Sequence, residues 1–401
     1  MRFNLRMILI MLLIIKTLII NSSFAQFDSE LFHGMKARSI GPAGMSGRIG
    51  DIEAVFSNPN IIYIGAATGG VWKSTNGGTT WKPIFDDQPA SSIGAISVFQ
   101  PNPSIVWVGT GEGNPRNSVG VGNGIYKSLD GGESWQYLGL EKTEKIHRVV
   151  LHPTDPDVAY VAALGTTWSE NPERGVFKTR DAGKTWEKVL FVNEQTGCAD
   201  LVMDPGNPNK LFAAMWEHRR WPWFFKSGGP GSGLYVTYDG GEQWKKITEK
   251  DGLPKGQFGR IGIAIAHSNP DVVYALIEAT KSALCRSDDG GRTWKIVNQS
   301  PNVNPRPFYY ADIRVDPQNE NRVYSLHSRL TVSEDGGKSF ERIRSRVHSD
   351  HHALWIHPEN GKFMIDGNDG GVAISYVVFA MKLFSIKSIY GSTRISFEVG
   401  N

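Results

Sequence analysis

The segment Ser128-Leu129-Asp130-Gly131-Gly132-Glu133-Ser134-Trp135 decides the fold, because close copies of it recur along the chain. An Asp or Asn at the start of a tight turn accepts hydrogen bonds from the amides that follow it. The glycines provide the positive φ angle that a reversing hairpin needs, and the closing aromatic residue begins the next strand. In the six copies, the Asp or Asn stands at Asn76, Asp130, Asp181, Asp239, Asp289 and Asp335.

The spacing of the copies predicts the architecture. They lie about 50 residues apart, which is typical of propellers and repeat arrays. Each copy follows a second turn that contains Asn-Pro or Asp-Pro, or its equivalent, and then an apolar strand such as Ile61–Ile64. The unit therefore has four strands, with the repeated turn between the third and the fourth. We expect the first strands to begin at Ile49, Ile93, Ile146, Cys198, Phe258, Tyr309 and Ala353. The sequence predicts an all-β, seven-bladed β-propeller.

The composition excludes several other classes of protein. The 45 glycines follow no three-residue period, which excludes collagen, and 2 cysteines cannot form a disulfide scaffold in 401 residues. We expect Cys198 and Cys285 to be buried free thiols. The net charge of +3 is too small for a nucleic-acid-binding protein.

The first 25 residues are predicted to be a signal peptide. Arg2 and Arg6 precede an apolar run, and Ser23-Phe24-Ala25 is a small-x-small cleavage site, so we expect cleavage after Ala25. An uncleaved membrane anchor is the alternative, but Lys16 interrupts the apolar run. No later segment is apolar enough to span a membrane. We therefore expect a secreted or periplasmic protein.

The propeller is expected to occupy residues 26–376. After Tyr376 the pattern requires another Asp, Gly and Trp, but residues 377–401 contain no such turn. We expect this tail to be the truncated or frame-shifted end of a longer protein. The outer strand of the last blade would then be absent, or would come from Lys36–Ile40.

The six turns resemble the Asp-box (BNR) signature, S-x-D-x-G-x-x-W. From about Phe27 to Ser375 the chain resembles the sortilin-type and BNR-repeat propellers, a group that includes sialidases and two-propeller xyloglucan hydrolases. The resemblance implies the propeller fold. It also implies a structural role for the repeated Asp, away from any active site.

The topology of a blade separates two faces. The turns between strands one and two, and between strands three and four, lie on one face. The loops between strands two and three lie on the other face, with the segments that lead into strand one. We call this second face the loop face, and propeller sites usually lie there. Its candidate residues for carboxylate chemistry are Glu112, Asp350, Asp366 and Asp369.

Two further sets of residues are candidates for ligand binding. Arg48, Arg148 and Arg260 stand near the start of first strands and could hold an acidic ligand. We favour instead that these arginines pair with acids such as Asp51 and Asp312. Trp216, Trp221 and Trp223 belong to an aromatic insertion, which is either a platform for sugar rings or a protein partner, or a local hydrophobic cluster.

A metal site is a weaker candidate. His348, Asp350 and His352 alternate along a short segment, as ligands of a divalent ion can. Such a segment is more often a polar strand start, so we expect no cofactor.

The comparison of motifs favours binding over catalysis. Xyloglucan hydrolases carry an Asp after strand two of the first blade, in the context Arg-Thr-Asp-Ile-Gly-Gly, whereas this chain has Ala66-Ala67-Thr68-Gly69-Gly70. Asp369-Gly370-Gly371 resembles only in part the motif that supplies the second carboxylate of those hydrolases. Sialidases need a Tyr nucleophile and an Arg-Ile-Pro segment, but here Ile49-Gly50 follows Arg48.

We therefore predict a non-catalytic propeller that recognises a protein or a glycan through its loop face. The alternative is a glycoside hydrolase that acts on polysaccharide. The sequence does not determine the oligomeric state.

Overall fold

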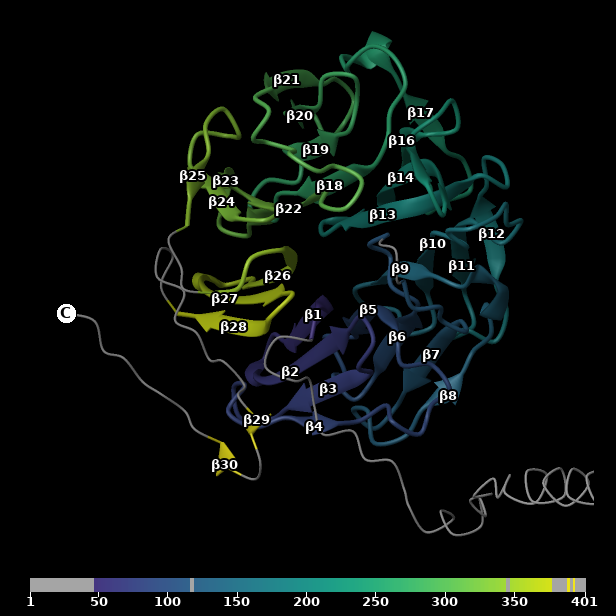
Figure 1. Cartoon of the computed structure of the whole chain (residues 1–401), viewed down its shortest axis with the longest axis vertical. Helices are drawn as coiled ribbons and strands as arrows, with labels where there is room; N and C mark the ends of the chain where they lie inside the picture. The colour runs from purple at the N-terminus through teal and green to yellow at the C-terminus, as the bar shows by residue number, and fades with distance from the viewer. Residues whose placement is uncertain (1–46, 116–118, 344–346, 377–387, 390–391, 394–401) are drawn as a thin grey trace, which may run out of the picture. The chain divides into compact units, whose positions relative to one another are not determined.

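The computed structural model describes residues 47–115, 119–343, 347–376, 388–389 and 392–393. The strands form seven small antiparallel sheets around a centre, so the predicted seven-bladed propeller is confirmed (Figure 1). The inner strands of blades one to seven are β1 (Ile49–Val55), β5 (Ile93–Val98), β9 (Ile146–Leu151), β13 (Thr196–Asp204), β18 (Ile261–Ile265), β22 (Asp312–Asp316) and β26 (His351–His357). The observed starts lie within three residues of the predicted ones.

The remaining strands follow outward in chain order. Blades one to three contain β2 (Asn58–Ala66), β3 (Val71–Ser74), β4 (Lys82–Pro83), β6 (Val106–Thr110), β7 (Ile125–Ser128), β8 (Gln136–Tyr137), β10 (Ala159–Ala163), β11 (Gly175–Thr179) and β12 (Glu187–Leu190). Blades four and five contain β14 (Asn207–Trp221), β15 (Phe224–Ser227), β16 (Gly233–Thr237), β17 (Lys245–Ile247), β19 (Val273–Ile277), β20 (Ala283–Ser287) and β21 (Lys295–Asn298). Blades six and seven contain β23 (Asn319–Leu326), β24 (Leu330–Ser333), β25 (Glu341–Arg342), β27 (Asn360–Asn368) and β28 (Gly371–Ser375). The short elements η2 (Glu141–Thr143), η3 (Glu249–Asp251), β29 (Ser388–Ile389) and β30 (Ser392–Thr393) complete the described set.

The hydrophobic core lies between the blades. Each inner strand contacts the inner strand of the next blade, and β1 contacts β26, which closes the ring. At that junction Ile49 and Ile52 of blade one belong to one buried cluster with Trp355 and Ile365 of blade seven. Because every blade is covered on both sides, second strands such as β6 are buried along their whole length.

The repeated turn is held by a hydroxyl group. In blade two, Ser128 Oγ accepts from the amide of Gly132 at 2.7 Å and donates to Asp130 Oδ1 at 2.7 Å. Asp130 Oδ1 also accepts from the amide of Ser134 at 2.9 Å. The amide of Gly131 donates to the carbonyl of Ser104, in the turn between strands one and two. The two kinds of turn therefore lie on the same face, as predicted.

The two cysteines are free and buried, as expected, with Cys198 in β13 and Cys285 in β20.

The predicted signal peptide, residues 1–25, and the candidate strand Lys36–Ile40 lie outside the described residues. In blade seven, no described strand pairs with the outer edge of β28. No helix in the described ranges is long and apolar enough to cross a bilayer.

The third repeat provides a test of the turn geometry. Ala182 stands there with a φ of 62°, where the other copies have a glycine, such as Gly131 with a φ of 71°. A Cβ in this conformation costs roughly 1–2 kcal/mol. We therefore expect Ala182→Gly to raise the free energy of unfolding by about 1 kcal/mol, measured by urea denaturation. The matched reverse change, Gly131→Ala, should lower it. An unchanged urea midpoint for Ala182→Gly would contradict this account.

Candidate functional site

A buried carboxylate and an arginine meet on the loop face. Glu112 follows β6 with its side chain only 1% exposed, and Arg48 leads into β1. Arg48 Nε lies 2.6 Å from Glu112 Oε1, and Arg48 Nη2 donates to Glu112 Oε2 at 3.0 Å. Arg48 Nη1 also donates to the Tyr309 hydroxyl at 2.5 Å. Burial raises the pKa of Glu112 to about 7, although the charge of Arg48 acts in the opposite direction.

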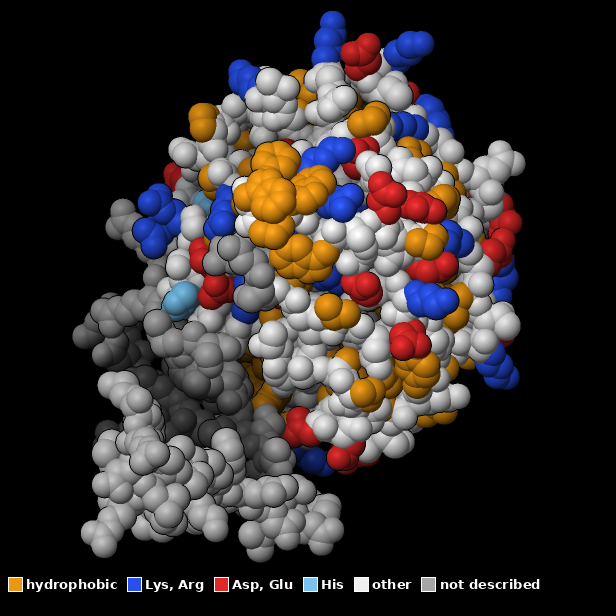
Figure 2. All heavy atoms as spheres, turned by 45° about the vertical axis from the view of Figure 1, so that its right-hand side comes forward, with side chains coloured by type: hydrophobic (Ala, Val, Ile, Leu, Met, Phe, Trp, Pro, Cys, Tyr) orange, Lys and Arg blue, Asp and Glu red, His pale blue; other side chains and the backbone are white. Residues whose placement is uncertain are grey.

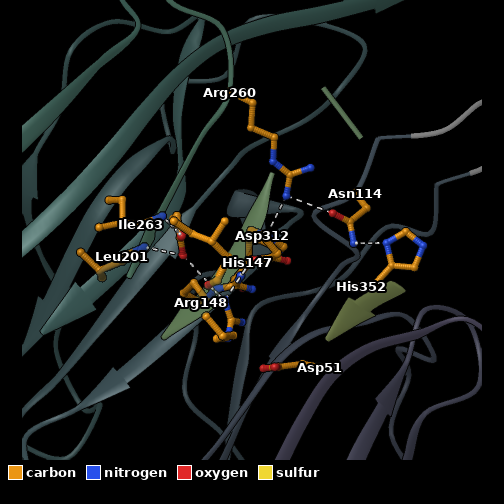
Figure 3. Close-up of polar contacts among 12 residues, drawn as sticks. Asp51, Asn114, His147, Arg148, Leu201, Arg260, Ile263, Asp312 and His352 are labelled. Atoms are coloured by element: carbon orange, nitrogen blue, oxygen red, sulfur yellow. Dashed lines mark hydrogen bonds and ion pairs between the residues drawn. The ribbon is translucent and has the colours of Figure 1, made fainter. Parts of the chain in front are cut away.

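A chain of hydrogen bonds leads to a second carboxylate. Arg260 Nη2 donates to Asn114 Oδ1 at 3.0 Å, which turns Asn114 Nδ2 toward His352 Nδ1 at 3.5 Å (Figure 3). His352 Nε2 lies 3.0 Å from Asp369 Oδ1. Burial lowers the pKa of His352, so the ring is neutral at pH 7 with its proton on Nε2. The last hydrogen bond of this series is therefore donated by His352 Nε2 to Asp369 Oδ1.

The pKa values of Glu112 and Asp369 are displaced in opposite directions. Partial burial acts to raise the pKa of Asp369, but the hydrogen bond from His352 and the charge of Arg48 bring it below its usual value. The charge of Asp369 in turn helps to raise the pKa of Glu112. We call Arg48, Glu112, His352 and Asp369 the Glu112 cluster. It holds one carboxyl group that is readily protonated at neutral pH and one that stays ionised.

The other loop-face candidates of blade seven are engaged separately. Tyr310 donates from its hydroxyl to Asp350 Oδ1 at 2.5 Å, and its ring stacks on His352. His348 Nδ1 contacts the carbonyl of Ser349 at 2.7 Å. His348, Asp350 and His352, the candidates for a metal site, therefore face different partners. The described residues contain no group of three or more His, Cys, Asp or Glu side chains arranged to hold a metal ion.

The three arginines do not form one triad. Arg148 lies within β9 and pairs with Asp200 at 3.0 Å and with Asp312 at 2.5 Å (Figure 3). Asp200 also accepts from the amide of Ile263 in the next blade. Arg148 is therefore part of the scaffold, paired with acids as we favoured, whereas Arg48 and Arg260 lie in the candidate site.

Two other predicted site residues are buried inside strands. Asp366 lies inside β27, fully buried, and binds His351 Nδ1 at 2.8 Å and Asn368 Nδ2 at 2.9 Å. Trp216 is also fully buried, and its ring stacks on His218 with centroids 4.4 Å apart. Both therefore contact other residues of the protein.

The aromatic insertion forms a hairpin, because β14 continues and pairs with β15. Trp223 at its tip is 83% exposed, while Trp221 is half-buried with the guanidinium of Arg219 over its ring at 4.7 Å. Phe224 pairs with Trp221 across the hairpin. Figure 2 shows hydrophobic side chains gathered on one face of the molecule, with charged side chains beside them. The hairpin thus presents aromatic surface to solvent.

Sequence reasoning did not single out Asn114 or His147. Asn114 links Arg260 to His352, and His147 Nε2 accepts from Arg260 Nη2 at 2.9 Å. The residue in the sequence that could have indicated this contact is Gly113. A Cβ at this position would lie 2.1 Å from His147 Nδ1, so only glycine allows His147 to lie this close to the backbone.

Comparison with known proteins agrees with this architecture. A model of the family described as "Sortilin, neurotensin receptor 3" matches residues 123–260. A xyloglucanase from a Paenibacillus species is 24% identical in an alignment 329 residues long, which covers 72% of this chain and 30% of that protein. The chain spans about a third of the length of the curated relatives it matches.

Solved structures show the same fold. The GH74 xyloglucanase from Xanthomonas campestris superposes with a TM-score of 0.61 at 17% identity, covering 85% of this chain and 53% of that one. YCF48 bound to D1 peptide superposes with a TM-score of 0.56 at 15% identity, covering 84% of this chain and 95% of that one. These findings fit a sortilin/BNR-type propeller related to glycoside hydrolases. Among its relatives, those matched by sequence are xyloglucanases.

The buried ion pairs of Arg148 can be tested by Arg148→Met, which leaves Asp200 without its cation and leaves Asp312 with only the longer contact of 3.3 Å to Arg314. Breaking a buried pair costs about 3–5 kcal/mol, so we expect a loss of this size at pH 7 by urea denaturation. Although burial acts in the opposite direction, Arg148 holds the pKa of Asp312 below its usual value, and this contribution is lost only as the pH falls. The difference between the two proteins should therefore shrink from pH 7 to pH 3, with the loss confined to the range below about pH 4, where the Asp carboxyl of the unfolded chain takes up its proton.

The control is Lys82→Met, which removes an exposed ion pair of 2.9 Å with Glu133. It should change stability by less than about 1 kcal/mol at either pH. An equal loss of unfolding free energy in the two variants would show that the ion pairs of Arg148 stabilise the fold no more than an exposed pair does.

Proposed function

We propose that this propeller is the carbohydrate-active part of a secreted glycoside hydrolase that acts on polysaccharide, with Glu112 and Asp369 as its carboxyl pair. The observation that carries the proposal is the opposite displacement of two pKa values within one cluster. Environments that separate the pKa values of two carboxyl groups assign an acid and a base. Glycoside hydrolysis needs such a pair.

The roles follow from the protonation states. Glu112, with a pKa of about 7, retains a proton near neutrality and serves as the general acid for the leaving oxygen. Asp369 stays ionised, and its side chain is 27% exposed, so a substrate can reach it from the solvent. It acts as the base or nucleophile. Arg48 positions Glu112, and the donor chain from Arg260 orients Asp369 through His352.

This placement of the acid differs from the motif of the xyloglucan hydrolases. Residues 67–70, after β2, have no carboxylate. Glu112 stands two residues after β6, the second strand of the next blade. A carboxyl group therefore follows a second strand on the loop face, but one blade further along. We infer that the substrate belongs to the xyloglucan class, after which these relatives are named.

The test is hydrolysis of xyloglucan and mixed-linkage β-glucan by the purified chain, followed as release of reducing ends. We expect Glu112→Gln and Asp369→Asn each to lower kcat by roughly 10²–10⁴-fold, with unchanged circular dichroism. Glu133→Gln, an exposed carboxylate in the repeated turn of blade two, is the control and should retain full activity. If the wild type hydrolyses none of these glucans, the hydrolase proposal fails.

A second candidate is recognition without catalysis, favoured by the exposed hairpin. Trp223 and Phe224 are 83% and 57% exposed, and aromatic side chains are frequent anchors of binding surfaces. In addition, both Glu112 oxygens face Arg48. YCF48, a propeller of similar extent, has been solved with a D1 peptide bound, so this fold can serve as a binding module.

The two candidates differ in what the hairpin contributes. If recognition is the function, Trp223→Ala should weaken binding of xyloglucan oligosaccharides by about tenfold or more in isothermal titration calorimetry. Glu112→Gln should leave this affinity within about twofold. Tyr238→Ala, an exposed aromatic residue in the repeated turn of blade four, is the control. Equal affinities for the Trp223 variant and the wild type would remove the hairpin from the binding surface.

A further inference from the structure

Four buried hydrogen-bond donors lie at the junction of blades three and four. They are Lys145 Nζ, Thr167 Oγ1, Arg174 Nε and His218 Nε2, and none has a hydrogen-bond partner among the described residues. Buried polar atoms are paired in nearly all native structures, so each such atom requires an explanation. Their number at one junction indicates a common cause.

Hydrogen bonds connect the segments that carry these four residues. Arg174 Nη1 lies 3.2 Å from His218 Nδ1, across the boundary between the blades. Arg174 Nη2 donates to the carbonyl of Thr166 at 2.6 Å, directly before Thr167. The amide of Leu164 donates to the carbonyl of Lys145 at 2.9 Å, so the segment 164–167 connects Lys145 with Arg174. The charges of Lys145 and Arg174 both act on His218.

All four unsatisfied atoms can donate a hydrogen bond. Because His218 Nδ1 accepts from Arg174, His218 Nε2 carries the proton of the neutral ring. The ammonium of Lys145 and the Nε of Arg174 can only donate, and the hydroxyl of Thr167 can also donate. What would satisfy this junction is therefore an acceptor.

The junction also brings two buried cations together. Lys145 is 1% exposed and Arg174 is fully buried. The charges of Glu144 and Glu170 act on them, but within the described ranges neither cation has a carboxylate at ion-pair distance. Burial lowers the pKa of Lys145 to about 8 and that of Arg174 to about 10, the direction expected for cations held away from water. Buried cations cost several kcal/mol unless an anion compensates them.

We propose that this junction binds a small monovalent anion, either a free halide-sized ion or the carboxylate of a small ligand. An anion placed among these donors offsets the charge of the two buried cations, whereas a water molecule accepts only two hydrogen bonds. A pocket of about 200 Å3 lies beside His218 and is also lined by Glu170, Glu217, Arg219 and Trp221. The site is independent of the hydrolytic roles proposed for Glu112 and Asp369.

Thermal unfolding at constant ionic strength tests the proposal. Sodium HEPES, whose anion is too large for the site, is exchanged stepwise for sodium chloride, acetate or galacturonate. We expect at least one of the three to raise the Tm of the wild type by about 5 °C at saturation. Lys145→Met should abolish this rise. The control is Lys178→Met, which removes a buried lysine that donates to the carbonyl of Gly240 at 2.6 Å. It should preserve the rise.

A milder variant keeps the test decisive if Lys145→Met fails to fold. Thr167→Val removes only the hydroxyl and should raise the anion concentration at half-maximal stabilisation several-fold. A response to chloride alone identifies a free ion, and a response to acetate or galacturonate identifies a carboxylate. Equal Tm values in all salts, or a rise that survives in both variants, overturns the proposal.

Crystals soaked in sodium bromide give a direct readout. An anomalous peak within about 3.5 Å of Lys145 Nζ and Arg174 Nε is the expected result. Peaks on the outer surface alone would mean an adventitious ion only and would overturn assignment of a halide.

Discussion

The contact between β1 and β26 closes the ring, and the candidate site depends on it. Ile49 and Trp355 pack together there, and Trp355 Nε1 donates to Glu53 Oε1 at 3.1 Å across the same junction. Burial raises the pKa of Glu53 to about 8, so this carboxyl group is readily protonated beside the apolar cluster. The Glu112 cluster needs the closure because Arg48 precedes β1, whereas His352 and Asp369 belong to blade seven.

The two faces of the ring are built on different principles. On one face the same hydroxyl, carboxylate and glycine pattern recurs, and the amide of the turn glycine is tied to the neighbouring turn of its own blade. On the loop face no pattern recurs. Buried ion pairs such as that between Arg148 and Asp312 occupy the inner strands, and the Glu112 cluster and the blade three–blade four junction carry the less balanced charges. Repeated turns on one face therefore support a non-repeating set of charged side chains on the other.

The fold was predictable because its signals are local. A turn such as Ser128–Trp135 fixes two strand ends by itself, and copies at a regular spacing fix the number of blades. Glu112 and Asp369 were among the predicted carboxylates because topology alone assigns loops to a face. Their partners were not predictable, since Arg48 and Glu112 meet only in the closed ring. Asp366 and Asp369 differ by three residues, yet one lies inside a strand and one in a turn. In the same way, Trp216 is fully buried in β14, whereas Trp223 is exposed at the tip of the hairpin.

The donor chain from Arg260 through Asn114 and His352 to Asp369 draws on blades five, two and seven. Gene duplication of a single blade can multiply the repeated turn, but it cannot transmit an arrangement whose members belong to different copies. The arrangement therefore depends on loops that the copies do not share. For the same reason a chain that lacks any one of these three blades retains recognisable repeats but not this series of hydrogen bonds.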